Sequence, residues 1–219
     1  FFTSVAHEFC TPLTLIYGSG EQLLSSYTLS PDVARHVRIV KNNAARMQRL
    51  IGELMDFRRV DTGHYEPRYA EVNVSELLSS IADNFNEVNG QRRIDLRMSL
   101  PEADVVIVSD RDALEKILYN LVSNAYKYTP SGGEIRVSMK TPGILCIKDT
   151  GIGIAPEDLP RIFERGYTGL NGRADKKASG LGLYLCKRIC DNLNHRIWAE
   201  SGEGTAVYLD LRSKKLETE

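Results

Sequence analysis

Hydrophobic positions divide the chain into two regions that differ in period. Up to about residue 61 the apolar side chains recur every three or four positions, which is typical of amphipathic helices. Ser30 and Pro31 suit the N-cap and first turn of a helix, so we expect an antiparallel hairpin of two helices, over about 1–26 and 31–61. The second helix carries apolar residues at alternating steps of four and three, as in a helical-bundle seam: Val33, Val37, Val40, Ala44, Met47, Ile51 and Leu54.

Two helices bury too little apolar surface to be stable alone, so this seam predicts a partner. A second copy of the chain is the simplest partner, because it would complete a dimeric four-helix bundle. The alternative is that the seam packs against the rest of the same chain. We expect a homodimer.

After residue 63 the pattern changes to short apolar or alternating runs separated by helical segments. The runs predict strands at about 93–99, 104–108, 134–140, 144–149, 195–201 and 205–211, and helices at about 75–89, 111–128 and 181–194. This order predicts an α/β sandwich with helices on one face of a mixed sheet. We therefore expect two domains, 1–63 and 64–219.

Within the second domain, the stretch 165–179 is rich in Gly, Lys, Asn and Arg and has no apolar period. We expect it to be a loop that becomes ordered when a ligand binds under it.

Composition restricts the partners. The 219 residues carry a formal net charge of -1, so no overall field attracts nucleic acid or acidic lipid, and we expect no nucleic-acid binding. The four cysteines form no CxxC pair, which fits free thiols in a reducing compartment. We see no signal peptide and no apolar run near the roughly 18 residues that span a bilayer. Because the chain starts inside a motif, we expect a longer protein around it.

Two asparagines lie one helical turn apart on the helix expected at 111–128. Asn120 and Asn124 therefore project from one face, and amide oxygens are hard ligands that suit Mg²⁺ while it keeps waters and phosphate oxygens. Lys127 and Tyr128 follow at the helix end, near the same position. Taken alone, such a pair is as typical of a solvated helix face.

Two glycine turns accompany these asparagines. Asp149 ends an apolar strand and opens a turn in which Gly151 and Gly153 permit a backbone path that side chains would block. A carboxylate there can accept a hydrogen bond from an adenine amino group, although a lone turn of this kind is often only structural. The second turn leads into a helix whose N-H groups and dipole favour phosphate oxygens; it consists of Gly180, Leu181 and Gly182. It is not a Walker loop, and the combination predicts a nucleotide pocket.

The N-terminal motif His7-Glu8-Phe9-Cys10-Thr11-Pro12 offers a nucleophile. A neutral imidazole keeps a lone pair for attack on phosphorus, and Glu8 is an adjacent carboxylate that can act as a base. Thr11, four residues after His7, shares its helix face. A His-Glu pair on a helix is ordinarily plain surface, and only the nucleotide pocket downstream changes that interpretation.

In order, the motifs resemble the H, N, G1, F and G2 boxes of sensor histidine kinases of two-component signalling, with Arg161–Arg165 as the F box. The resemblance covers nearly the whole chain. It implies an antiparallel dimerisation and phosphotransfer hairpin of the HisKA type, then an α/β sandwich ATP-binding domain of the GHKL type shared with gyrase and Hsp90. The segments 54–58 and 61–64 are similar to those of hybrid sensor kinases.

The resemblance also implies roles for single residues. His7 would be the phosphoacceptor, Glu8 a base or orienting group, and Thr11 the residue that positions water in a phosphatase reaction. Asn124 would be the principal Mg²⁺ ligand, Asn120 a second, and Asp149 the adenine reader. Further nucleotide contacts would come from these residues: Lys127, Tyr128, Gly151, Gly153, Phe163, Gly180, Leu181 and Gly182.

Four positions depart from the family pattern. Cys10 stands where arginine is usual, Gly166 and Thr168 replace common aromatic and basic residues, and Ala178 replaces a frequent glycine. These changes concern docking and the contacts of the loop to the terminal phosphate, whereas the nucleophile, base and metal ligands are intact.

We therefore expect an ATP- and Mg²⁺-dependent protein-histidine kinase that phosphorylates His7 and passes the group to an aspartate of a response regulator receiver domain, fused or separate, with possible phosphatase activity. The resemblance implies the cytoplasmic portion of an inner-membrane sensor, anchored through segments upstream. The alternatives are a nucleotide-binding dimeric scaffold or pseudokinase, and a GHKL-type ATPase without phosphotransfer.

Overall fold

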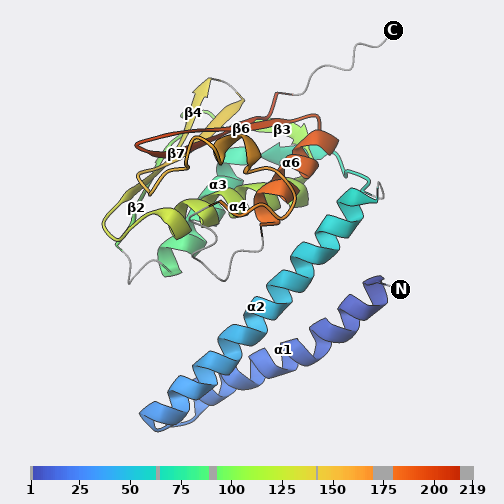
Figure 1. Cartoon of the computed structure of the whole chain (residues 1–219), viewed down its shortest axis with the longest axis vertical. Coiled ribbons are helices and arrows are strands. Elements are labelled where there is room, and N and C mark those ends of the chain that lie inside the picture. Colours follow the sequence, from blue (N-terminus) through green and yellow to red (C-terminus); the bar gives the residue numbers. More distant parts are fainter. Residues whose placement is uncertain (1, 63–64, 89–92, 142, 170–179, 213–219) are drawn as a thin grey trace. The chain divides into compact units, whose positions relative to one another are not determined.

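The structure is a computed structural model that describes residues 2–62, 65–88, 93–141, 143–169 and 180–212 (Figure 1). The chain divides into two compact units, Phe1–His64 and Tyr65–Glu219, and each is described by itself. Of the loop expected at 165–179, residues 170–179 lie outside the described part.

The first unit is the predicted antiparallel hairpin. Helix α1 spans Phe2–Ser26 and runs on through Pro12, and helix α2 spans Pro31–Asp61. The start of α2 is the one the sequence predicts, because the Ser30 hydroxyl accepts a hydrogen bond from the Val33 N-H at 3.4 Å and proline occupies the first turn.

Close packing and polar pairs hold the two helices together. Gly20 faces Lys41 so closely that an added Cβ would lie 3.0 Å from the Lys41 Cβ. Lys41 also forms an ion pair with Glu21 of α1. Nearer the open end, the Gln48 amide donates to the Thr14 hydroxyl at 2.8 Å. These contacts fix the register of the hairpin at two levels.

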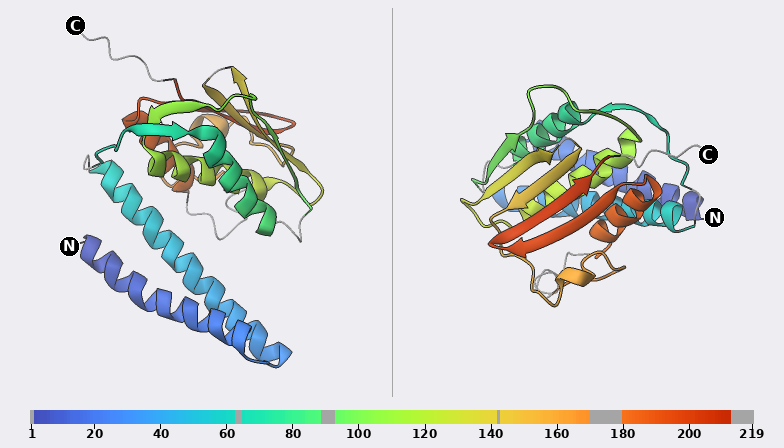
Figure 2. Two further views of the ribbon diagram at one scale, coloured as in Figure 1. Left: turned by 180° about the vertical axis from the view of Figure 1, so that it is seen from behind. Right: turned by 90° about the horizontal axis from the view of Figure 1, so that it is seen from above.

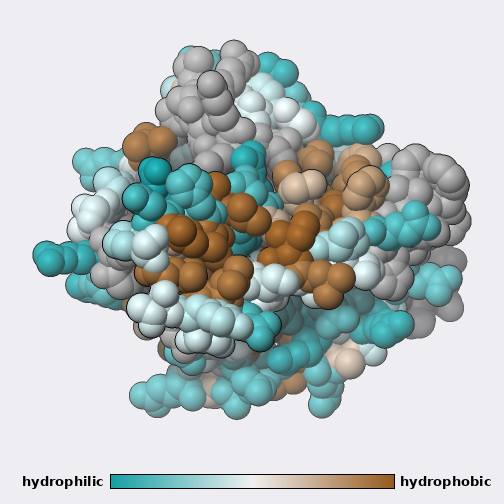
Figure 3. All heavy atoms as spheres, turned by 90° about the horizontal axis from the view of Figure 1, so that it is seen from below, coloured by the Kyte–Doolittle hydropathy of each residue, from teal (hydrophilic) through white to brown (hydrophobic). Residues whose placement is uncertain are grey.

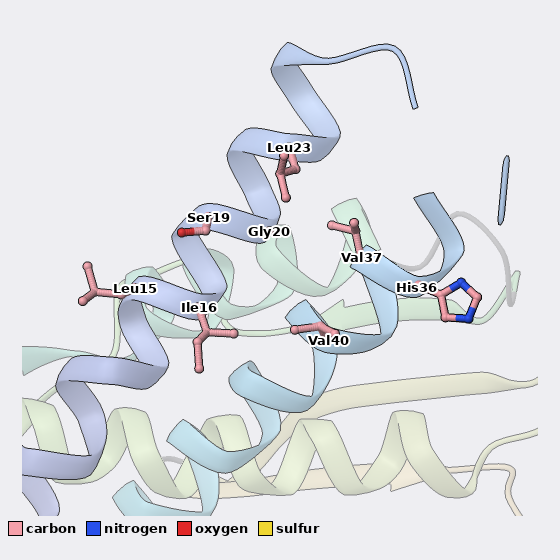
Figure 4. A pocket seen from close by; sticks show the side chains of 8 residues that line it. All are labelled: Leu15, Ile16, Ser19, Gly20, Leu23, His36, Val37 and Val40. Atoms are coloured by element: carbon pink, nitrogen blue, oxygen red, sulfur yellow. The ribbon is translucent and has the colours of Figure 1, made fainter. Parts of the chain in front are cut away.

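Much of the apolar seam stays exposed on the hairpin. Ala44 is buried, but the other seam residues Val33, Val40, Met47 and Leu54 keep 48%, 54%, 49% and 48% of their surface exposed. A groove of about 460 Å³ runs between the helices, and Figure 4 shows it; the lining residues are Leu15, Ile16, Ser19, Gly20, Leu23, His36, Val37 and Val40. Figure 3 shows hydrophobic side chains gathered on the viewed face, over the hairpin. The hairpin thus presents an apolar surface that needs cover.

The second unit is the predicted α/β sandwich. Its five-stranded mixed sheet has the order β2-β4-β5-β7-β6, in which only β2 and β4 are parallel. The strands are β2 (Asp95–Ser99), β4 (Glu134–Thr141), β5 (Ile144–Asp149), β6 (Arg196–Gly202) and β7 (Gly204–Asp210). Figure 2 shows the helices on one face of this sheet; they are α3 (Val74–Val88), α4 (Arg111–Tyr128) and α6 (Gly182–Asn192). A 3-10 turn, η2, spans Leu159–Arg161.

One strand is absent from the sequence prediction. Strand β1 (Ala70–Asn73) pairs antiparallel with β3 (Val106–Ser109), so β3 belongs to a separate two-stranded sheet and not to the main one. The core lies between the helices and the main sheet, where the largest side chains are almost fully buried: Leu77, Leu78, Leu114, Ile117, Leu118, Leu121, Ile135, Leu145 and Leu209.

Two buried features of this unit bear on stability. Cys186 and Cys190 pack in the core on α6, and burial raises the pKa of Cys190 to about 12. His195 is buried at the start of β6, where its Nε2 lies 2.9 Å from the Ser109 hydroxyl. Burial lowers the pKa of His195 and outweighs the opposing effect of Asp210.

Within the described ranges, no helix is both long and apolar enough to cross a bilayer.

Candidate active site

Helix α4 carries the asparagine pair. Its start is fixed by the buried Asp110, whose carboxylate accepts hydrogen bonds from the N-H of Ala113 at 3.0 Å and of Arg68 at 2.8 Å. Burial acts to raise the pKa of Asp110, but these hydrogen bonds outweigh burial and hold the pKa below its ordinary value. Asn120 and Asn124 are both half-buried. The Asn120 amide nitrogen donates to the Lys116 carbonyl at 3.3 Å, which leaves its Oδ1 to face α6.

Asp149 ends β5 as a buried carboxylate with one oxygen already held. Its Oδ1 accepts the N-H of Gly151 at 2.8 Å and the N-H of Thr205 at 3.2 Å. Within the described residues its Oδ2 accepts no hydrogen bond, so this oxygen is available to a ligand amino group. Burial raises the pKa of Asp149, and the two backbone hydrogen bonds act in the opposite direction.

The turn after Asp149 packs against the end of α4. An added Cβ on Gly151 would lie 2.5 Å from the Tyr128 carbonyl oxygen, and the Ile152 N-H donates to that oxygen at 3.3 Å. Gly153 follows with a φ of +69°, the left-handed region that favours glycine. These two glycines therefore have the steric roles that the sequence predicts.

The second glycine turn meets α4 two helical turns earlier. An added Cβ on Gly182, the first residue of α6, would lie 2.6 Å from the Asn120 Oδ1. None of the described side chains caps the start of α6. The helix dipole and the first N-H groups therefore give this end of α6 a partial positive charge beside the asparagine amide.

Helix α4 thus brings both turns into one site. The Asp149 turn contacts its last residue, Tyr128, and the Gly182 turn contacts Asn120. Lys127 lies at the same end of α4, with its Nζ 4.9 Å from the centre of the Tyr128 ring. Phe163 is half-buried after η2, and its contact with a nucleotide stays a prediction.

Sequence reasoning missed a third glycine turn at this site. Gly204, between β6 and β7, has a φ of +84°, and an added Cβ would lie 1.9 Å from the Asp149 carbonyl oxygen. The next residue, Thr205, holds the Asp149 carboxylate through its N-H. The sequence signal is the segment Gly202-Glu203-Gly204-Thr205 between two strands. This segment contributes to the site through backbone atoms, which give little signal in the sequence.

The phosphoacceptor motif lies in the other unit, within α1. Glu8 and Thr11 are exposed and Cys10 is half-buried. The side chain of His7 lies outside the described part of the chain, so its predicted role rests on the motif. The spacing of four residues between His7 and Thr11 is helical, as expected.

The described residues suit a divalent cation that is held partly by the amide oxygens of α4, and they offer no site built from protein carboxylates, imidazoles or thiols alone. Among the described residues there is no cluster of three or more His, Cys, Asp or Glu side chains that could hold a metal ion. Mg²⁺ keeps several waters and is commonly held by one or two protein oxygens together with substrate phosphates. Asn120, beside the start of α6, and Asn124, one helical turn further along α4, would offer such a set.

Comparison with known families decides what the chain is. Residues 1–63 match the model of the His Kinase A (phospho-acceptor) domain, and residues 109–215 match that of the histidine kinase-, DNA gyrase B- and HSP90-like ATPase. The chain belongs to the sensor histidine kinases. One match lies in each of its two units.

Individual relatives agree with this assignment. The histidine kinase core is 36% identical over 201 residues, 87% of its length, to histidine kinase P4 of Formosa agariphila. It is 30% identical over 98% of its length to the sensor histidine kinase WalK of Bacillus subtilis. It spans only 14% of the first relative and 36% of the second. The crystal structure of full-length ShkA in complex with AMPPNP matches 95% of this core and 44% of that chain, with a TM-score of 0.75 at 24% identity, and supports the fold.

Membership of this family confirms the resemblance seen in the motifs and the predicted ATP-binding fold. In the histidine kinase core, the N box is part of α4, and the G1 and G2 boxes both contact this helix. Gly151 and Gly182 approach α4 so closely that a side chain at either position would collide with it. The roles of single site residues remain predictions.

Proposed function

We propose that this histidine kinase core transfers the γ-phosphoryl group of ATP to His7 and then to an aspartate of a response regulator. The observation that carries the proposal is the close approach of Gly182 to the Asn120 Oδ1, which joins the metal-binding amide to the start of α6. A site of this kind holds phosphates and their counter-ion side by side.

The adenine ring is read by Asp149. Its Oδ1 is held by two backbone N-H groups, so Oδ2 is presented in a fixed direction to the exocyclic amino group. The buried setting strengthens such a hydrogen bond, because no bulk water competes for it. The phosphates extend toward Gly180, Leu181 and Gly182, and Lys127 and Tyr128 flank them from the end of α4.

Mg²⁺ bound at Asn124 and Asn120 neutralises charge on the phosphates when ATP is present. Replacing either amide by a side chain without an oxygen would remove a ligand of the ion. The chain's own contribution is to hold the two amides one helical turn apart on a capped helix.

The chemical step needs a neutral imidazole on His7. One ring nitrogen attacks the γ-phosphorus, a nitrogen-phosphorus bond forms, and the bond from phosphorus to the bridging oxygen of ADP breaks. The proton on the other ring nitrogen leaves to Glu8 or to water, so the phosphohistidine is uncharged at the ring. Thr11, on the same helix face, positions water when the reaction runs as a phosphatase on the regulator.

The unit 1–63 serves as the dimerisation and phosphotransfer hairpin, and 64–219 as the catalytic ATP-binding domain. A second copy covers the apolar groove between α1 and α2, completing a four-helix bundle. The partner in phosphotransfer is a receiver domain, fused or separate. We place the core on the cytoplasmic side of the inner membrane, as part of a longer sensor protein.

Incubation with γ-labelled ATP and Mg²⁺ tests the proposal. We expect an acid-labile label on the protein that is lost in His7→Ala and kept in His36→Ala, an exposed histidine of the same hairpin. Label that survives in His7→Ala would refute the assignment of the nucleophile. Nucleotide binding without label would favour the alternative, a dimeric scaffold, and released phosphate without label would indicate an ATPase.

A further inference from the structure

Asp158 is a buried carboxylate that none of the predicted motifs uses. It stands at the N-cap position of η2, but its side chain makes no capping hydrogen bond there. Instead, its Oδ1 accepts the Tyr167 hydroxyl at 2.5 Å. Its Oδ2 faces Gly169, where an added Cβ would lie 2.5 Å away. The Asp158 carboxylate therefore faces the segment that follows the F box and holds it through the Tyr167 hydroxyl.

The Tyr167 ring is held from a second side. The Arg161 guanidinium lies over it, 4.3 Å from the ring centre, and Arg161 is itself fixed by a hydrogen bond to Glu164 at 3.0 Å. A cation over a ring and a charge-assisted hydrogen bond to the hydroxyl act on different parts of the same side chain. Tyr167 is thus anchored at both ends, while its backbone adjoins Gly166.

Gly166 links this anchor to the phosphate-binding turn. Its N-H donates to the Gly180 carbonyl at 3.1 Å. Both glycines have left-handed φ angles, +68° and +67°, and an added Cβ on Gly180 would lie 2.7 Å from the Gly166 carbonyl carbon. The two backbones can meet this closely because Gly180 has no side chain. An added Cβ on Gly166 would meet nothing within 4 Å, so glycine is favoured at that position by its left-handed φ alone.

We propose that Asp158 and Tyr167 are positioning residues for the phosphate-binding turn of Gly180 to Gly182. The anchor fixes Gly166, Gly166 fixes Gly180, and Gly182 two residues later lies against the Asn120 amide. Neither side chain need touch the nucleotide. The inference rests on the proposed function for its purpose, but the coupling from Tyr167 to Gly180 is a property of the protein without ligand.

A purely structural anchor would change stability without changing the turn, so the test needs a readout at the turn. Tyr167→Phe removes the hydroxyl and keeps the ring over which Arg161 lies. Tyr69→Phe is the matched control, because Tyr69 is 54% exposed in a segment outside the site. Asp158→Asn is a conservative variant that retains an oxygen to accept the Tyr167 hydroxyl, and Asp158→Ala removes both oxygens.

We expect amide hydrogen exchange at Gly166 and at Gly180 to Gly182, measured on the full chain without nucleotide, to rise at least about tenfold in Tyr167→Phe and Asp158→Ala. Tyr69→Phe and Asp158→Asn should exchange like the wild type. With Mg²⁺ and AMPPNP, the Kd should rise about tenfold in the first two variants only. Thermal unfolding of each variant without nucleotide separates this effect from general destabilisation.

Unchanged exchange at Gly180 to Gly182 in Tyr167→Phe would overturn the inference, as would faster exchange without any loss of AMPPNP affinity. Failure of the proposed kinase activity has a different signature. In that case the wild type acquires no label on His7, whereas the exchange and affinity differences among the variants persist.

Discussion

Replacement of Gly182 by alanine should separate activity from stability. Gly182 begins α6, and its φ is outside the left-handed region, so alanine is free to adopt the backbone conformation. Glycine costs a helix about 0.5–1 kcal/mol relative to alanine in an interior position, so the backbone term favours the variant or leaves stability unchanged. The expected loss of activity comes instead from the contact of the new methyl group with its neighbour.

That methyl group would lie 2.6 Å from the Asn120 Oδ1, where an ordinary contact is 3.4 Å or more. Relief therefore requires the Asn120 amide to move by about 0.8 Å. A displacement of about 1 Å in a positioned group can lower a rate by about a hundredfold. We expect kcat/KM for His7 phosphorylation to fall by about 10- to 100-fold in Gly182→Ala.

The assay combines initial rates of labelling from γ-labelled ATP with calorimetric unfolding of the same preparation. Gly52→Ala is the matched control, because Gly52 lies within α2 and an added Cβ there meets nothing within 4 Å. The control should label at the wild-type rate. Wild-type kcat/KM in Gly182→Ala would refute the reasoning, and so would a fall in Tm that accounts for the lost activity.

Three further outcomes follow from the structure. Burial lowers the folded-state pKa of His195, so on acidification the unfolded chain binds a proton at this residue before the folded chain does. The stability that His195 contributes is therefore complete above its unfolded pKa of about 6.5 and is lost as the pH falls toward the folded pKa. The urea midpoints at about pH 7.5 and 5.5 should differ less in His195→Gln than in the wild type, and an equal difference would contradict this. Gly204→Ala should destabilise the catalytic unit by more than about 2 kcal/mol, since its Cβ would collide with the Asp149 carbonyl oxygen, and a wild-type Tm would count against that contact. Val40→Glu, in the apolar groove, should convert dimers to monomers in sedimentation, whereas Ile39→Glu, exposed but outside the groove, should not; a dimeric Val40→Glu would show that the groove is covered by something else.

The hairpin and most of the sheet could be predicted because their signals are local and repetitive. The apolar period of three and four identifies α1 and α2, and Ser30 with Pro31 places their boundary. Strand β1 was missed because it has four residues, and only Val72 among them is buried. Strand β3 is equally short but reads as an apolar run, whereas the sequence of β1 shows neither a run nor a clear alternation.

The candidate site could be predicted where side chains supply the proposed chemistry and not where the backbone does. Asn120, Asn124 and Asp149 stand out by residue type and spacing. Thr205 acts through its N-H, which every residue except proline possesses, so its sequence signal is weak. The bond between Tyr167 and Asp158 joins residues nine positions apart across an irregular segment, where no period predicts which side chains meet.

The support of Asp149 by backbone groups has a consequence for inhibitors and resistance. A compound that donates a hydrogen bond to the Asp149 carboxylate, the proposed adenine reader, meets a group whose orientation is set by the N-H groups of Gly151 and Thr205. Substitution of a neighbouring side chain leaves both N-H groups in place, so it cannot readily turn the carboxylate away. Escape then requires a change at Asp149 itself, which the proposed adenine recognition also needs, or at Gly204, where a new side chain would collide with the Asp149 backbone.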